Sequence, residues 1–451
     1  MKLRRLMRLR SFFVSVLLSL FVVLTAHAQD IIDIPESSEV RSSLIDSWFE
    51  QPIPILRTCS EEELTSLDGT TFQVRFDDYG DESVIIVAPA KVEKVELYTD
   101  SGVEYSQRKM YKAESPGSWI LFRNSKTGEP TRIRFYFSVN TEIFIQFRKS
   151  ASIPAEKSLA DVMVFGEYAV KDVPVGIPLE YFYDMSCDDV LTLVRNVVPW
   201  ASQAFYSSLY NDILQMTGVI RENLPRFHLL EDVAYDDAGN LVSIKDGVPI
   251  SVPGAYDDAL YVSSPGFVKW IVDGLVRPLS GSGILREPLI KKTEVFKSGS
   301  LSDTMAKKYD TTLGLDWTRN LAAAMVSIYS GRDYTYEGSG VQLNSVPFND
   351  AYYESSGFKI SMLKPIFYYL AATEPGRFYL GAIRHTVNDG AEFVVYNECA
   401  AFFPAFDKNG KFSVVVFMDG EEVKIEDFTK DNDGDFIQLV RIQASEQFFP
   451  R

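Results

Sequence analysis

The stretch 261-YVSSPGFVKWIVDGL-275 holds the residues best suited to chemistry, because a serine pair opens an apolar helix pattern. Ser264 suits the N-cap position and Pro265 the first helical turn. A hydroxyl there lies near free backbone N–H groups and the positive end of the helix dipole, which stabilise an oxyanion. The alternative is a capped core helix. Apolar residues cover nearly the whole helix surface, and only Lys269 and Asp273 form a polar stripe.

The segment Ser263–Trp270, SSPGFVKW, resembles the Asp/Asn-Cys-Ser/Thr-Gly-Phe-Val motif of NlpC-type cell-wall peptidases, which have a papain-like fold. In that family the cysteine is the nucleophile and begins a buried central helix that packs on an antiparallel sheet. A histidine on the sheet is the base. The resemblance implies such a domain over residues 251–451. It makes Ser263, Trp270 and Asn397 candidate binding residues, and peptidoglycan peptides or another envelope protein the partners.

The sequence also departs from this motif at the residues that matter for catalysis. Serine stands at the cysteine position, and a serine needs a base in contact. His385 is the only histidine downstream, and it lies beside Asn388-Asp389-Gly390, which is typical of an exposed hairpin turn. Glu398 on the next predicted strand can face the start of the helix, while Asn397 and Cys399 share the other face. The candidate catalytic residues are therefore Ser264, His385 and Glu398.

Three functions remain open at this point. The first is an exported binding or scaffolding module that has lost the chemistry. The second is an active peptidase or amidase that uses Ser264 with His385, or Cys399 in another arrangement. The third is an exported structural protein with no catalytic ancestry. A second domain without a central helix that abuts an antiparallel sheet would favour the third function.

The N-terminus predicts export. Residues 1–28 contain five basic residues, an apolar run and a small-x-small site at Ala26-His27-Ala28, which is typical of a cleavable signal peptide. The run is short for a membrane anchor, the alternative reading. We expect a periplasmic or secreted protein with no stable membrane span after cleavage. The chain has 45 basic and 62 acidic residues, so the mature protein has a formal charge near −22. This charge repels nucleic acid, and we expect no nucleic-acid partner.

No cofactor or metal is expected from the sequence. Cys59, Cys187 and Cys399 are widely spaced, without a CxxC pair, and their disulfide status stays open. The alternating acids of 431-DNDGD-435 are similar to a calcium loop, but position six is not glycine and position twelve is not glutamate. An acidic turn is the favoured interpretation of this segment.

The predicted fold is multidomain α+β. Short β-branched and aromatic runs within residues 29–165 predict an antiparallel β-sandwich. Residues 166–250 form a linker and a helical segment, and residues 251–451 combine helices with an antiparallel sheet. Four aromatic residues of the first domain can either stack on sugars or belong to the sheet and core: Tyr98, Tyr105, Tyr111 and Trp119.

Overall fold

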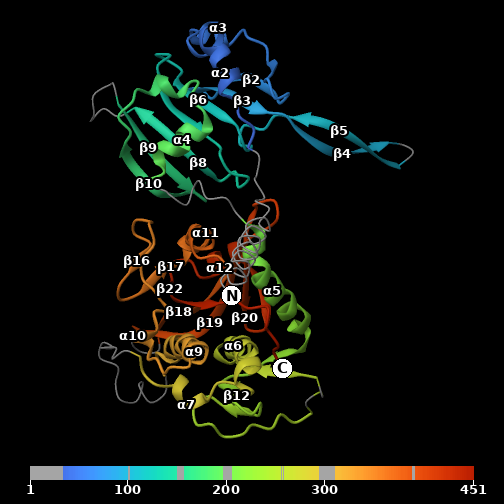
Figure 1. Cartoon of the computed structure of the whole chain (residues 1–451), viewed down its shortest axis with the longest axis vertical. Coiled ribbons are helices and arrows are strands. Elements are labelled where there is room, and N and C mark those ends of the chain that lie inside the picture. Colours follow the sequence, from blue (N-terminus) through green and yellow to red (C-terminus); the bar gives the residue numbers. More distant parts are fainter. Residues whose placement is uncertain are drawn as a thin grey trace, which may run out of the picture.

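The computed structural model describes residues 34–451, except 100–101, 150–156, 197–205, 255, 257, 294–309 and 389–391. The expected signal peptide lies outside the described residues. Two units follow one another along the chain, a β-rich domain and a domain of helices around a second sheet (Figure 1). The predicted α+β multidomain class is confirmed. Among the described helices, none has the length and apolar character needed to cross a membrane.

The first domain is built on one eight-stranded antiparallel sheet with the order β1-β2-β3-β6-β7-β8-β9-β10. Sequential pairing joins all these strands into a single sheet, rather than the two separate sheets of the expected sandwich. The sheet also continues past the predicted boundary at residue 165, through β10. The strands are β1 Glu62–Thr65, β2 Thr71–Asp78, β3 Glu82–Pro89, β6 Trp119–Asn124, β7 Pro130–Phe135, β8 Ile143–Lys149, β9 Ser158–Val164 and β10 Glu167–Pro174.

Short helical elements before and after the sheet close its core. They are α2 Ser38–Leu44, the π-helical turn η1 Ile45–Phe49, α3 Ile53–Leu56, the 3-10 turn η2 Leu179–Phe182 and α4 Cys187–Val194. Arg41 holds the two groups together. Its guanidinium is buried and donates to the carbonyls of Tyr183 and Met185, each at 2.7 Å. The N-terminal helices are therefore fastened to the segment that follows the sheet.

Strands β4 Lys91–Thr99 and β5 Gly102–Met110 form a separate two-stranded sheet that projects from the first domain (Figure 1). We call this hairpin the arm. Tyr98 and Tyr105 lie on it and are 81% and 59% exposed, whereas Trp119 is a core residue at 1%. Tyr111 is half-buried. Of the four aromatic residues that could stack on sugars or belong to the core, only Tyr98 and Tyr105 are therefore well exposed.

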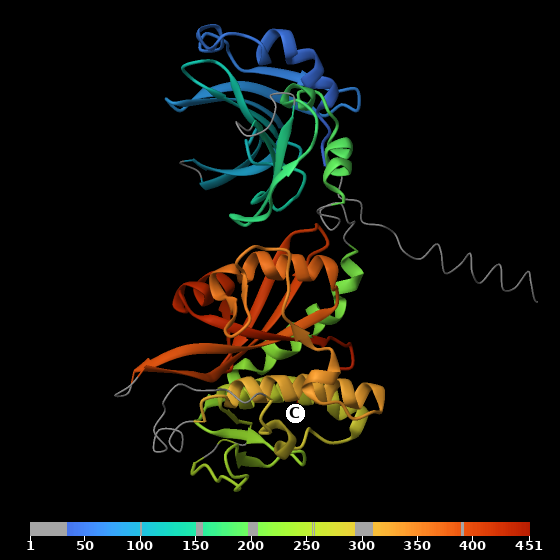
Figure 2. The same cartoon turned by 90° about the vertical axis from the view of Figure 1, so that its left-hand side faces the viewer.

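The second domain has three layers (Figure 2). Its sheet has the order β16-β17-β22-β18-β19-β20-β21, and β15 also pairs with β22. Helices α6 Ser264–Ser280 and α9 Leu313–Ser330 cover one face, and α5 Asn211–Asn223 and α11 Leu363–Thr373 cover the other. The strands are β15 Gln342–Leu343, β16 Tyr352–Tyr353, β17 Gly357–Lys359, β18 Arg377–Asn388, β19 Glu392–Phe406, β20 Phe412–Met418, β21 Glu421–Lys424 and β22 Phe436–Gln443.

Smaller elements surround α6. The strands β11 Phe227–Leu229 and β14 Leu260–Val262 pair in parallel, and β12 Val233–Tyr235 pairs with β13 Leu241–Ser243. The other short elements are η4 Ser207–Tyr210, η5 Leu224–Arg226, α7 Arg286–Leu289, α10 Tyr336–Ser339, η6 Ile360–Met362 and α12 Ile425–Asp431. Because these strands and the sheet lie on different sides of α6, its whole circumference is buried.

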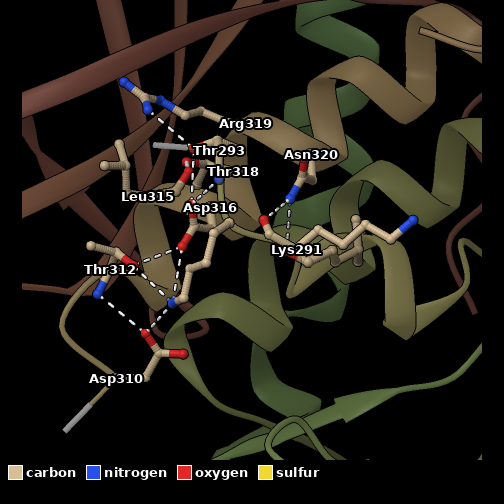
Figure 3. A network of polar contacts seen from close by, with 11 residues as sticks. Lys291, Thr293, Asp310, Thr312, Leu315, Asp316, Thr318, Arg319 and Asn320 are labelled. Carbon is tan, nitrogen blue, oxygen red and sulfur yellow. Dashed lines mark hydrogen bonds and ion pairs between the residues drawn. The ribbon is translucent and has the colours of Figure 1, made fainter. Parts of the chain in front are cut away.

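A buried polar network fixes the start of α9 (Figure 3). Asp316 is 1% exposed, and one of its carboxylate oxygens accepts from the backbone N–H and the hydroxyl of Thr293, at 2.7 and 2.8 Å. The other oxygen accepts from the Thr312 hydroxyl at 2.7 Å and lies 3.2 Å from the Lys292 ammonium. The network thus joins the segment of Lys292 and Thr293 to the start of α9.

The two domains touch through a few specific contacts. The Asn140 side chain donates to the Gly410 carbonyl at 3.0 Å and accepts from the Phe412 N–H at 2.9 Å. Phe165 packs beside Tyr368 of α11 and Phe412 of β20. The first domain therefore contacts the second at helix α11 and at the hairpin between β19 and β20.

Candidate functional site

Ser263, not Ser264, is the N-cap of α6. Its hydroxyl accepts from the Gly266 N–H at 3.2 Å and donates to the Val233 carbonyl at 2.8 Å. Gly266 is required because a Cβ there would lie 2.2 Å from that carbonyl oxygen. Ser263 is 6% exposed, so it is a structural residue rather than the binding residue that the sequence suggested. The predicted cap is therefore displaced by one residue, and Ser264 is the first helical residue.

Ser264 contacts the backbone of the central strand β19. Its hydroxyl oxygen accepts from the Cys399 N–H at 2.8 Å, and the hydroxyl can donate to the Cys399 carbonyl at 3.2 Å. Both polar groups of one strand residue are thus joined to the start of α6. The motif-like serine does lie where a helix begins against an antiparallel sheet, as the resemblance implies.

The Asp419 side chain completes this site from the turn between β20 and β21. Asp419 and Gly420 have φ values of 55° and 79°, and Met418 pairs directly with Glu421. These are the features of a two-residue type I′ hairpin, for which Asp-Gly is a preferred sequence. Gly420 is packed so tightly that an added Cβ would lie 2.6 Å from the Phe227 side chain. The pair in 417-FMDGEE-422 was a readable hairpin signal that the sequence analysis missed.

Burial raises the pKa of the Asp419 carboxyl, and hydrogen bonding with Ser264 opposes this rise. The nearby acidic side chains of Glu398 and Glu421 raise it further. One carboxylate oxygen, Oδ1, is buried without a hydrogen-bond partner. The group beside Ser264 is therefore a carboxyl whose pKa is raised by burial, and not an imidazole.

The backbone of Cys399 contacts the start of α6, and its side chain points toward the start of α9. Its side chain is fully buried, and its Sγ lies 3.8 Å from the Gly314 carbonyl of α9. Burial raises the pKa of this thiol, so it stays protonated at neutral pH. A thiol that is buried and stays protonated is a poor nucleophile, which disfavours the alternative arrangement that used Cys399.

His385 and Glu398 meet each other on the opposite face of the sheet. The His385 Nε2 atom lies 3.1 Å from Glu398 Oε2, and Nδ1 lies 2.9 Å from Asp435 Oδ2. Because Cys399 points toward α9, its neighbour Glu398 points away from the helix. The structure therefore does not bring Ser264 and His385 together. Glu398 does not face the start of α6.

The position of His385 also differs from the expected exposed turn. It lies within β18, opposite Val395 of β19, and is half-buried. Strand β18 continues for three residues beyond His385 and ends at Asn388. A register shift between Ile383 and His385 adds one residue to the β19 side, a β-bulge that also contains Asn397. Asn397 is exposed, whereas Asp435 of the predicted acidic turn is used to bind the histidine.

The ion pairs of His385 are expected to make the free energy of unfolding depend on pH. Hydrogen bonding to Glu398 is the main cause that raises the pKa of His385, and Asp435 adds to it. Since the folded pKa is above the unfolded value of 6.5, the stabilisation is complete below pH 6.5 and disappears as pH rises through the folded pKa. We expect His385→Gln to cost about 1 kcal/mol or less, since the site is partly solvated.

This prediction is checked by thermal unfolding of the wild type and His385→Gln from about pH 6 to about pH 9. The difference between the two proteins should shrink as pH rises. His228→Gln, at an exposed histidine, is the control. A difference that grows with pH would contradict the assigned ion pairs.

Trp270 is a core residue. It is 3% exposed, its Nε1 donates to the Arg451 carbonyl at 2.9 Å, and its ring packs edge-on against Phe227 and Phe448. It is therefore not available as the binding residue that the sequence suggested. Within the described part of the chain, no three His, Cys, Asp or Glu side chains are grouped so as to hold a metal ion, and all three cysteines are free.

Comparison with known proteins gives one family match. Residues 32–202 match a family model described as "Domain of unknown function (DUF8515)". This range covers the first domain and ends before α5. No curated protein and no solved structure matches the chain. The second domain, which holds Ser264 and Asp419, therefore has to be interpreted from its own geometry.

Proposed function

We propose that this chain is an exported cell-envelope protein whose second domain is a non-hydrolytic, NlpC-like binding or scaffolding module. The observation that carries the proposal is the binding of the Ser264 hydroxyl by the backbone of Cys399. In the described residues, no imidazole contacts this hydroxyl. The motif-like segment SSPGFVKW and the packing of α6 on an antiparallel sheet support the NlpC-like ancestry.

The chemistry at Ser264 is unfavourable for hydrolysis. A serine nucleophile requires a base that accepts its proton and is itself held in place by a third group. Here the neighbours are a buried thiol at Cys399 and a carboxyl at Asp419 with a raised pKa. The β20–β21 turn also lies beside the hydroxyl, and Gly420 is packed against Phe227. The site is better suited to holding the helix and strand together than to attacking a carbonyl.

The ligand follows from the resemblance. A domain that descends from cell-wall peptidases would retain affinity for the peptides of peptidoglycan, or for an envelope protein that carries them. The acidic mature chain supports a partner other than nucleic acid. Export, as the N-terminal sequence predicts, would bring the protein to that ligand.

Incubation of the purified mature protein with peptidoglycan tests the proposal. We expect no new muropeptide fragments by mass spectrometry from the wild type or from Ser264→Ala, together with co-sedimentation of the wild type with the peptidoglycan. Fragments from the wild type alone would instead establish a peptidase with Ser264 as its nucleophile. Neither fragments nor co-sedimentation would favour a protein partner or a purely structural role.

Ser264→Ala should also lower the free energy of unfolding, by about 1–3 kcal/mol, because the Cys399 N–H is left without its acceptor. Denaturant unfolding measures this loss. Ser280→Ala is the matched control, since Ser280 lies at the exposed end of the same helix and should change stability by about 0.5 kcal/mol or less. Equal effects for the two variants would contradict the role assigned to Ser264.

A further inference from the structure

The turn between β9 and β10 places an aromatic residue in a backbone conformation that suits it poorly. Val164 pairs directly with Glu167, and the two residues between them, Phe165 and Gly166, have φ values of 49° and 84°. This is the geometry of a two-residue type I′ turn, whose first position favours Asn, Asp or Gly. A bulky residue with a positive φ is strained by the close approach of its Cβ to a carbonyl oxygen. The equivalent position of the β20–β21 turn holds Asp419, which tolerates this conformation.

The contacts of the Phe165 side chain account for a phenylalanine in this turn. Its ring packs against Tyr368 of α11 and Phe412 of β20, with ring centroids 5.8 and 5.7 Å away. The Lys364 ammonium of α11 lies 4.5 Å from the centroid of the same ring. All three partners belong to the second domain. The strained residue of the first domain is therefore held in place by contacts between the two domains.

Other contacts between the domains are polar and come from the loop between β7 and β8. The Asn140 side chain binds the backbone of the β19–β20 hairpin at Gly410 and Phe412. The Glu142 carboxylate lies 3.5 Å from the Lys364 ammonium, and both side chains are partly exposed to solvent. Interfaces of this polar kind within one chain resemble transient interfaces, and relative motion of the two domains is then the expected behaviour.

We propose that the two domains exchange between a docked and a separated arrangement, and that Phe165 sets the balance between them. In the docked arrangement the ring makes its contacts while the backbone of the turn is strained. Separation loses the contacts and allows the turn to relax, so docking is weaker than the contacts alone would make it. A partner that binds one arrangement better than the other would shift this balance. This inference is independent of the function proposed for the second domain.

Hydrogen exchange of the full mature protein tests the proposal at the amide of Phe412, whose N–H donates to the Asn140 side chain across the interface. Separation exposes this amide without unfolding the second domain. The Cys399 amide, which donates to Ser264 inside the second domain, opens only when that domain unfolds. In the wild type we expect the Phe412 amide to be protected, with a protection factor about tenfold or more below that of Cys399.

Three variants assign this effect to the turn. Phe165→Asn removes the ring and suits the turn, and it should lower the protection factor of the Phe412 amide by about tenfold or more. Phe165→Ala also removes the ring but keeps a strained Cβ, so the amides of β9 and β10 should be better protected in Phe165→Asn than in Phe165→Ala. Tyr168→Ser is the matched control, at an aromatic residue of the same hairpin that is 38% exposed, and should leave the Phe412 amide unchanged.

Three results would overturn the proposal. One is a wild-type Phe412 amide that is either unprotected or as well protected as the Cys399 amide, because the protein would then have a single arrangement. Another is a protection factor at Phe412 that Phe165→Asn leaves unchanged. The third is protection of β9 and β10 in Phe165→Asn that does not exceed that in Phe165→Ala, which would show that the turn is not strained. An unchanged Cys399 amide confirms in each variant that the second domain is folded.

Discussion

Lys269→Met is expected to lower the free energy of unfolding of the second domain by about 3–5 kcal/mol. Lys269 and Asp273 lie one turn apart on α6 and are 1% and 2% exposed, and their side chains form an ion pair. Asp273 also accepts from the Ile284 N–H at 2.8 Å. Removal of the ammonium leaves a carboxylate buried with little compensation, since Arg277 approaches it only to 4.0 Å.

A double variant separates this effect from a simple loss of packing. Lys269→Met/Asp273→Asn has no buried charge, and its amide oxygen can still accept from the Ile284 N–H. We expect it to recover most of the stability that Lys269→Met loses, because a neutral pair does not require a buried counter-ion. Calorimetric unfolding of both variants and the wild type measures the recovery. If the double variant is as unstable as the single one, the ion pair is not the cause.

Asp316→Ala should destabilise the second domain by about 3 kcal/mol or more, because several donors to one buried carboxylate lose their acceptor together. The Thr293 N–H and the hydroxyls of Thr293 and Thr312 donate to it (Figure 3). The Lys292 ammonium also lies 3.2 Å from one of its oxygens. Hydrogen exchange gives a local readout, and the amide of Thr293 should exchange much faster in the variant.

Asp316→Asn is the conservative comparison for this network. Its amide oxygen can still accept from Thr293, but its NH₂ group faces the Thr312 hydroxyl and the Lys292 ammonium. We expect an intermediate loss of stability and protection of the Thr293 amide close to that of the wild type. Fast exchange at Thr293 in both variants would show that the negative charge, rather than the accepted hydrogen bond, holds this segment.

The elements of the fold were largely predictable, because their signals are local. The continuous apolar pattern after Pro265 predicted a buried helix, and α6 is one. Alternation and β-branched residues predicted β18, β19, β20 and β22. The polar stripe on α6 was the exception, since its burial depends on β12, which packs on the helix and comes from a segment without a helix-like or long strand pattern.

The candidate site was predictable only in part. The start of α6 was located from the sequence. The residues that contact Ser264 there depend on which face of β19 meets the helix. Cys399 points toward α9, so Glu398 and the His385 that it contacts lie on the other face of the sheet. Asp419 reaches Ser264 through a tertiary contact, so even a correct hairpin prediction would not have shown its role.

The contact between Ser264 and Cys399 has a consequence for how this protein can change during evolution. Every residue type except proline offers the same backbone N–H and carbonyl, so the contact places no demand on the side chain at position 399. That side chain is restricted only by the space beside Gly314. Substitution at position 399 by other small apolar residues is thus permitted, whereas position 264 is limited to residues that present an acceptor at the first turn of the helix. A survey of natural variants should find several small apolar residue types at position 399 of the strand and little variation at position 264 of the helix.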